Sequence, residues 1–302
     1  MLTRRRFIAI TAALAPALTP AAGLARAEDL HVETGHALGA QVTLRLHHPD
    51  AVRLAALAMD EIARLERVFS LYLPDSALAR LNRDGALAEP PFELLECLTR
   101  AGAVHAASGG RFDPTVQPLW AAEAAARQRG GTLGAAERAA VRALVGWSGV
   151  RLSPQAVTLR PGMALTLNGI AQGFIADRVA ALLADHGLTR ALIDTGEMVA
   201  LPEGRWPVGL PGGGEVALQG RALATSAPLG MTFGGDGVTS HILDPRTGRP
   251  LRPRWRSVTV SAPMAALADA LSTAICLTDS RAEAEAICAA FDGAGLVSAI
   301  PA

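Results

Sequence analysis

Two stretches, TSHILDPRTGRPL at residues 239–251 and SVTVSAPMAALADALST at residues 257–273, hold most of the features that decide the fold of this chain. In the first, the lone histidine His241 stands in a short apolar run that predicts a strand. The DPRTG sequence at 244–248 has the composition of a tight turn, because Asp opens such turns, Pro fixes φ and Gly closes them. A second strand is predicted over 257–261, and a helix follows the next proline.

On that helix, Asp269 and Thr273 are four residues apart, so their side-chain oxygens are expected on one helical face. A carboxylate and a hydroxyl are hard oxygen donors, which suit Mg²⁺ better than zinc. The alternative is that Asp269 is a solvated surface charge and Thr273 merely its neighbour, since polar pairs at this spacing are common on exposed helices. The pattern alone leaves both interpretations open.

Length and charge narrow the class of protein. The chain has 302 residues, enough for one large domain or two modest ones with a real core. Basic and acidic residues balance at 28 each, so the sequence has no overall basic character of the kind that binds nucleic acid.

The first 27 residues are predicted to be a twin-arginine signal peptide, which makes residues 28–302 the mature domain. TRRRFI at 3–8 is a twin-arginine pattern, an Ala- and Leu-rich stretch follows, and ARA at 25–27 is a small-x-small cleavage site. Prolines interrupt the apolar stretch, which argues against a permanent membrane span. We therefore expect a periplasmic protein that has no stable membrane span.

Strands and helices interleave irregularly along the chain, with hairpins between them. This order favours an α+β fold, with mixed or antiparallel sheet and helices packed on its faces. Besides the two strands of the opening stretch, strands are expected at 41–47, 149–152, 156–160, 163–167, 190–194, 198–201, 206–210, 215–218 and 222–225. Helices are expected at 50–69, up to 82, at 92–107, at 121–145 with a Gly-Gly break, from 170 to 187, at 264–277 (the helix of the opening stretch) and at 280–291.

The sequence NGIAQG at 168–173 leads from a predicted strand into a helix. A glycine at a helix N-terminus exposes backbone N–H groups that attract phosphate. The spacing is neither the dinucleotide-binding GxGxxG nor a P-loop. On its own it is a weak indication of a phosphate ligand.

Seven segments in this order resemble the ApbE family of FAD:protein FMN transferases, and the resemblance runs from about Leu38 to Ala290. The exported, shorter members that accompany nitrous oxide reduction look especially similar. The segments are FSLYLPDSALARLN (69–82), GGRFDPTVQPL (109–119), LNGIAQGFIADRVAALL (167–183), IDTGE (193–197), ATS (224–226), SHILDPRTGRP (240–250) and SVTVSAPMAALADALST (257–273).

The resemblance implies an ApbE-like, T-fold-related domain with a flavin cleft, which transfers the FMN half of FAD to a Thr or Ser hydroxyl of a target protein and releases AMP. Mg²⁺ would be held by Asp269, Thr273 and a backbone carbonyl at Gly169, with Ser272 assisting. His241 would orient or deprotonate the acceptor hydroxyl. The implied target is a flavoprotein domain of a membrane electron-transfer system. Residues implied to contact FAD are Leu38, Tyr72, Phe112, Asp113, Thr166, Gln172 and Leu243.

Some of these residues have ordinary alternatives: His241 as a core histidine of a strand that bonds to backbone, Tyr72 as a packed ring, Asp113 as a turn cap, and Leu38 and Leu243 as core. Two positions depart from the family pattern. Thr166 stands where members often have Asp, and Gln172 replaces the usual Lys of GIAKG. Both changes predict weaker FAD binding or a different choice of substrate, and they keep open the function of a flavin carrier or assembly factor without transfer activity. A third possible function is an FAD pyrophosphatase, which would use the same metal with water as the nucleophile.

Overall fold

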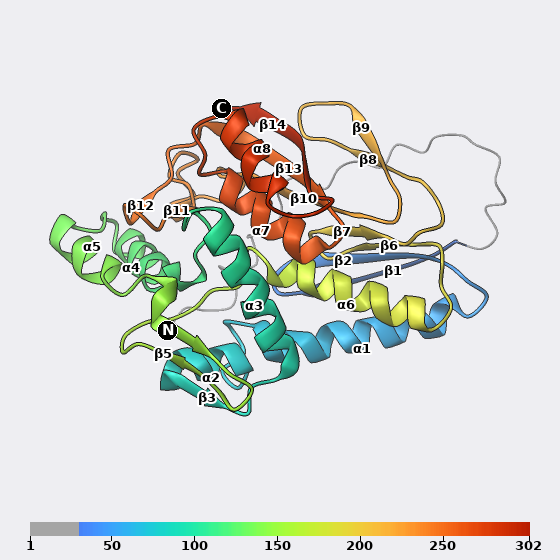
Figure 1. Ribbon diagram of the computed structural model, residues 1–302, viewed down its shortest axis with the longest axis horizontal. Coiled ribbons are helices and arrows are strands. Elements are labelled where there is room, and N and C mark those ends of the chain that lie inside the picture. Colours follow the sequence, from blue (N-terminus) through green and yellow to red (C-terminus); the bar gives the residue numbers. More distant parts are fainter. Residues whose placement is uncertain (1–29) are drawn as a thin grey trace.

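The computed structural model describes residues 30–302, which form the α+β fold predicted from the sequence (Figure 1). Its centre is a seven-stranded sheet in the order β1-β2-β6-β7-β10-β13-β14, and every neighbouring pair is antiparallel. The strands are β1 (Leu30–Ala37), β2 (Ala40–His47), β6 (Ala191–Asp194), β7 (Met198–Ala200), β10 (Ala222–Ser226), β13 (Trp255–Ala262) and β14 (Gly295–Pro301).

Helices cover one face of this sheet. Helix α1 packs on β1, β2 and α6, while α7 packs on α6, β10 and β13, as Figure 1 shows. Helix α3 lies on the outer side of α7, and α8 packs on β14. These helices are α1 (Ala51–Phe69), α3 (Phe92–Ala107), α6 (Ala171–Asp185), α7 (Ala265–Ile275) and α8 (Arg281–Ala289).

The alternation of side chains along the strands separates two hydrophobic clusters. Ile193 of β6 belongs to the large core under the helices, whereas its neighbour Leu192 belongs to a small cluster on the opposite face. That second face is covered by the hairpin of β8 (Trp206–Gly209) and β9 (Glu215–Leu218), through Trp206 and Leu218. The β8–β9 hairpin therefore gives this face an apolar cover, and the polar side chains of β2 lie beside it.

The crossing of α6 and α7 is fixed by two contacts. A Cβ added to Gly173 would lie 2.3 Å from the carbonyl oxygen of Ala265, so only glycine allows the helices to come this close. The Asp177 carboxylate of α6 accepts the N–H groups of Ala265 and Ala266, at 2.7 and 2.9 Å, and so caps the start of α7. Burial raises the pKa of Asp177 to about 6.

The remaining elements extend this centre. A three-stranded sheet in the order β3-β5-β4 adjoins α2, and α4 and α5 pack on each other near the short β11–β12 hairpin. These elements are α2 (Ala77–Asp84), β3 (Ala86–Ala88), α4 (Gln117–Gln128), α5 (Ala135–Arg142), β4 (Val150–Leu152), β5 (Ala156–Leu159), β11 (Leu243–Asp244) and β12 (Arg249–Pro250), with 3-10 turns at Pro114–Val116, Trp147–Gly149 and Phe233–Gly235.

The strand predictions need correction at one absent strand, at the short strands β3 and β12, which were not predicted, and at two edge strands of the main sheet. The strand expected at 163–167 is absent, because this segment bonds to a side chain instead of a neighbouring strand: Asn82 donates to the Leu165 carbonyl and accepts the Leu165 N–H, at 2.8 and 2.7 Å. Strands β1 and β14 were not predicted. Both lie at the edges of the sheet, where side chains are partly exposed on both faces and a clean alternation is missing.

The N-terminal prediction lies outside the described residues, which begin at Leu30. Within residues 30–302, no helix combines the length and the apolar character needed to cross a bilayer.

Candidate active site

A cavity of about 540 Å³ opens where the β1–β2 hairpin, the ends of β6 and β10, the start of α6 and the middle of α7 meet. This volume is in the range of small-molecule and cofactor sites. The cavity brings together side chains from segments that are distant in the sequence. Its lining includes all but one of the predicted site residues, namely Leu38, Tyr72, Phe112, Asp113, Thr166, Gly169, Gln172, His241, Leu243, Asp269 and Thr273.

The carboxylate of Asp269 is buried at the wall of this cavity, with 3% of the residue exposed. The Gly173 N–H donates to it from 3.4 Å, which is a long hydrogen bond. Burial raises the pKa of Asp269 to about 8, and burial together with the negative charge of Asp269 raises the pKa of its neighbour Glu197. A buried carboxylate with so weak a donor is a group that a cation would stabilise.

Thr273 presents its hydroxyl one turn further along α7, as the four-residue spacing predicts. Gly169 lies directly over it, because a Cβ on Gly169 would be 3.0 Å from Thr273 Oγ1. Within residues 30–302, no cluster of three or more His, Cys, Asp or Glu side chains is placed to hold a metal. A cation here would therefore take one carboxylate with hydroxyl and carbonyl oxygens, and that donor set fits Mg²⁺.

Ser272 is the predicted metal-binding residue that the structure places elsewhere. It is fully buried and does not line the cavity. Its hydroxyl donates to the Asp269 carbonyl at 2.9 Å, one turn back in α7, and contacts Ser226 Oγ at 2.7 Å. The Ser272 hydroxyl is thus occupied inside the helix packing, behind Thr273, and its role toward a metal stays a prediction.

Ser226, at the end of β10, joins these hydroxyls into a chain. Since the Ser272 proton goes to a carbonyl, the Ser226 hydroxyl donates to Ser272 and its oxygen is left to accept from Thr273, 3.3 Å away. This order of donors directs the proton of Thr273 toward Ser226. The lone pairs of Thr273 are thereby left for the cavity.

His241 lies on a segment that is pinned on both sides. Its Nδ1 is 2.9 Å from the Met231 carbonyl, and the preceding Ser240 hydroxyl donates to the Pro228 carbonyl at 2.8 Å. Burial lowers the pKa of His241, an effect that the carbonyls of Met231 and Pro228 oppose. The lowered pKa favours the neutral ring, and with Nδ1–H donated to Met231 its Nε2 is left as an acceptor.

The turn that follows His241 forms as predicted, although the strand is shorter than expected. Gly248 N–H donates to the Asp244 carbonyl at 2.7 Å, and β11 covers two residues only. Helix α5 holds the turn from outside, because Arg138 donates to the Gly248 carbonyl and Arg142 to the Arg246 carbonyl, both at 2.7 Å. The turn that follows His241 is therefore held by contacts more than 100 residues away in sequence.

A model of the ApbE family matches residues 38–294. The chain belongs to the ApbE family. An ApbE relative from Treponema pallidum, named FAD:protein FMN transferase, is 33% identical over 72% of this chain and 70% of its own length. A protein of the same name from Escherichia coli K12 is 28% identical over 82% of this chain and 78% of its own length.

Solved ApbE structures share the fold described above. The flavinyl transferase ApbE of Pseudomonas stutzeri, in its apo form, superposes with a TM-score of 0.74 and 26% identity, over 87% of this chain and 89% of that one. The ApbE protein of Thermotoga maritima superposes with a TM-score of 0.73 and 25% identity, over 87% and 88% of the two chains.

The residues predicted to contact flavin in this ApbE protein differ in their surroundings. Leu38 turns the β1–β2 hairpin at a φ of +48° and donates its N–H to Glu66 at 3.1 Å. Tyr72 is 49% exposed at the cavity, so its ring is accessible to a ligand. Leu243 is buried and packs with Leu119, so the core alternative describes its side chain well. Their roles toward flavin stay predictions.

The alternative for Asp113 also holds in part. Its carboxylate accepts the N–H and the hydroxyl of Thr115, at 2.9 and 2.6 Å, and so caps a 3-10 turn while it lines the cavity. The N–H of Thr166 donates a hydrogen bond to the Pro114 carbonyl at 2.8 Å, which holds Thr166 in place. The Gln172 amide packs against Gly196.

Polar groups at another part of the ApbE cavity were missed by sequence reasoning. Gln41, Thr43 and Arg45 line the cavity from β2, with Asp194 of β6 opposite Thr43. Burial raises the pKa of Asp194, and Arg45 acts in the opposite direction. The alternation of β2 marked Thr43 and Arg45 as a polar face, but alternation does not distinguish a face that meets water from one that lines a cavity.

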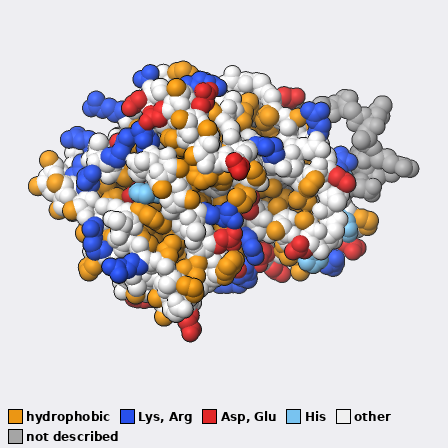
Figure 2. Space-filling model, viewed as in Figure 1, with side chains coloured by type: hydrophobic (Ala, Val, Ile, Leu, Met, Phe, Trp, Pro, Cys, Tyr) orange, Lys and Arg blue, Asp and Glu red, His pale blue; other side chains and the backbone are white. Residues whose placement is uncertain are grey.

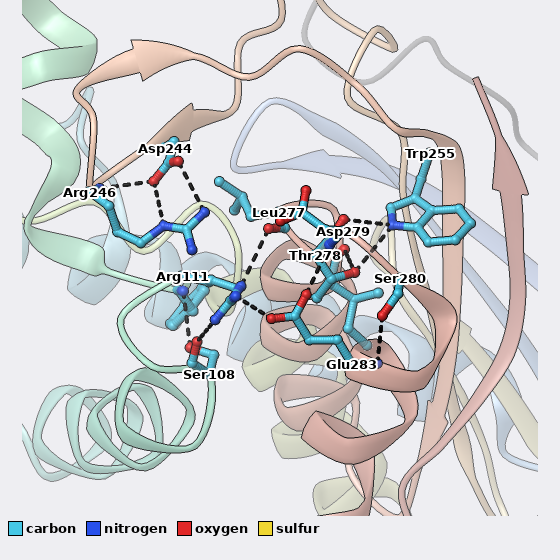
Figure 3. A network of polar contacts seen from close by, with 12 residues as sticks. Ser108, Arg111, Asp244, Arg246, Trp255, Leu277, Thr278, Asp279, Ser280 and Glu283 are labelled. Carbon is cyan, nitrogen blue, oxygen red and sulfur yellow. Dashed lines mark hydrogen bonds and ion pairs between the residues drawn. The ribbon is translucent and has the colours of Figure 1, made fainter.

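Arg111, which lines the cavity, was also missed, and Figure 3 shows its polar contacts. Its guanidinium forms an ion pair with Glu283 of α8 and donates to the Leu277 carbonyl at 3.3 Å. Leu277 lines both this cavity and a smaller neighbouring one of about 250 Å³. Trp255 fixes the same segment by donating to the Thr278 carbonyl at 3.2 Å.

Proposed function

We propose that this protein transfers FMN from FAD to a Thr or Ser hydroxyl of a target protein, with Mg²⁺ as the metal and AMP as the leaving group. The observation that carries the proposal is one cavity in which the hard oxygens of Asp269 and Thr273 and the imidazole of His241 all face the same space. The names of the ApbE relatives support the reaction.

The reaction balances as a phosphoryl-type transfer. The acceptor oxygen attacks the phosphorus of the FMN half, the phosphoanhydride bond breaks, and AMP leaves with the bonding electrons. The hydroxyl proton passes to a base, for which His241 Nε2 is suited because its lowered pKa favours the neutral ring. In phosphoryl transfer the enzyme acts mainly by positioning the reacting groups and by stabilising the charge that develops on the phosphate.

Asp269, Thr273 and the carbonyl of Gly169 are the groups that would hold Mg²⁺, which supplies positive charge against the pyrophosphate when it is bound. Ser226 and Ser272 would keep the Thr273 hydroxyl in place. The N-terminal end of α6 lies beside the cavity, and its helix dipole favours an anionic ligand, while the N–H groups of Ala171 and Gly173 are already donated to Leu167 and Asp269.

We further propose that the protein is exported to the periplasm by the twin-arginine route and acts on a flavoprotein domain of a membrane electron-transfer system. The sequence pattern of residues 1–27 supports this proposal. Replacement of Arg4 and Arg5 with lysine should trap the protein in the cytoplasm. Cell fractionation measures the outcome, and an unchanged periplasmic fraction would contradict this route.

The transferase proposal is tested with purified protein, FAD, Mg²⁺ and a candidate acceptor. Transfer predicts one AMP released for each acceptor that gains the mass of an FMN group. Release of both AMP and FMN without acceptor would indicate a pyrophosphatase, and bound FAD without products would indicate a carrier. The acceptor itself is found by mass spectrometry of periplasmic proteins, since a strain lacking this chain should lose the FMN adduct.

A further inference from the structure

The smaller cavity beside the active site has walls rich in guanidinium groups. Its lining includes Arg246, Arg249, Arg252 and Arg254, and we call this lining the arginine groove. The segment 245–256 that forms it contains no acidic residue. The chain as a whole carries equal numbers of basic and acidic residues, so this cationic excess is local.

Most of the charge in the arginine groove is available to a ligand. Arg246 is paired, since its Nε and Nη2 donate to Asp244 at 2.9 and 3.1 Å. Arg249, Arg252 and Arg254 are exposed, and none of their side chains makes an ion pair or hydrogen bond within residues 30–302. Asp279, also in the lining, is the one other acidic side chain there. Apart from the Arg246–Asp244 ion pair, the lining therefore holds three guanidinium groups and one carboxylate.

The arginine groove adjoins the active-site cavity. Leu277 lines both spaces, and Asp244 of the groove is followed directly by Pro245 of the active-site lining (Figure 3). Figure 2 shows Arg side chains gathered on the side of the molecule where β11 and β12 lie. The groove is therefore continuous with the segment that carries His241, three residues before Asp244.

We propose that the arginine groove docks an acidic segment of the acceptor protein and so delivers its hydroxyl to His241. This inference rests on the proposed function. Guanidinium groups bind carboxylates through two parallel hydrogen bonds, which fixes orientation as well as position. A groove that shares Leu277 with the reactive cavity suits an extended chain that continues into it, whereas an anionic membrane would call for a broad cationic face.

The test uses full-length FAD-loaded protein and two synthetic peptides, each with one threonine. One peptide surrounds the threonine with aspartates, and its twin carries asparagines at the same positions. The variant Arg249→Glu/Arg252→Glu reverses two charges in the groove. The control Arg53→Glu/Arg151→Glu makes the same net change at exposed sites outside the groove. Peptide binding is followed by fluorescence anisotropy, and FAD binding and AMP release without peptide are measured in parallel.

We expect wild type and the control variant to bind the aspartate peptide at least about tenfold more tightly than the asparagine peptide. The groove variant should bind the two peptides equally. FAD binding should not change. Equal binding of the two peptides, or equal loss in the control, would overturn the proposal. The proposal would also be overturned if the groove variant lost binding only to phosphatidylglycerol vesicles or only to FAD, because the groove would then serve a membrane or the nucleotide. Wild-type protein that transfers no FMN to the acceptor identified above would instead refute the proposed function.

Discussion

Gly173 of α6 lies against the backbone of Ala265 at the first turn of α7, and this contact sets the distance between the two helices that form the polar wall of the cavity. The same glycine donates its N–H to Asp269. One residue without a side chain therefore both permits the helix crossing and holds the proposed metal ligand.

Gly173→Ala should lower the free energy of unfolding by about 3 kcal/mol or more, because backbone atoms cannot move aside as side chains do. Denaturant unfolding measures the change. Gly295→Ala is the matched control, since a Cβ there meets no atom within 4 Å. An alanine at 173 as stable as the control would show that the two helices can separate at little cost.

The metal prediction concerns Asp269 and Thr273. Asp269→Asn and Thr273→Val keep the side-chain shapes but remove oxygens that bind a cation. Each should lower the rate of AMP release about 10²–10³-fold, the size seen when one preorganised group at a transition state is lost. Chelation with EDTA should stop wild-type release, and added Mg²⁺ should restore it. Wild-type activity that persists in EDTA would exclude the metal.

A pH prediction follows from the environment of His241. Burial disfavours the imidazolium, so the pKa lies below the ordinary 6.5 and the neutral base persists into mildly acidic solution. At saturating Mg²⁺, which keeps the Asp269 carboxylate ionised, the rate of FMN transfer should therefore stay level from pH 8 to about 6.5 and fall only below it. His241→Gln should remove the fall in rate at acidic pH and reduce the rate of FMN transfer about 10²–10⁴-fold, while FAD binding stays intact. A wild-type midpoint above 6.5 would contradict the assignment.

Ser226→Ala tests the hydroxyl chain. Without Ser226, Thr273 loses the acceptor that orients its proton, so the Mg²⁺ concentration for half-maximal rate should rise about tenfold. The rate at saturating Mg²⁺ should change much less. A purely structural defect would instead lower this rate as well as raise the Mg²⁺ concentration that is needed. Ser148→Ala removes an exposed hydroxyl and serves as control. A Mg²⁺ dependence equal to that of the control would refute the positioning role.

Local patterns determined much of this protein. The DPRTG turn, the helix with Asp269 and Thr273 on one face, and most strands follow from residue types and spacing over a few positions. The sequence missed edge strands β1 and β14, whose side chains are half-exposed on both faces. It also assigned a strand at 163–167, where Asn82 supplies the partners that a ladder would give.

Only the tertiary structure decided which groups meet. Ser226 acquires its role because β10 ends beside α7, and Arg45 because its strand face borders a cavity instead of water. Ser272 shares the periodicity of a ligand but is turned into the helix packing. Sequence spacing fixes which side chains share one face of one element. The convergence of separate elements depends on contacts such as that of Gly173 with Ala265, which join residues far apart in the chain.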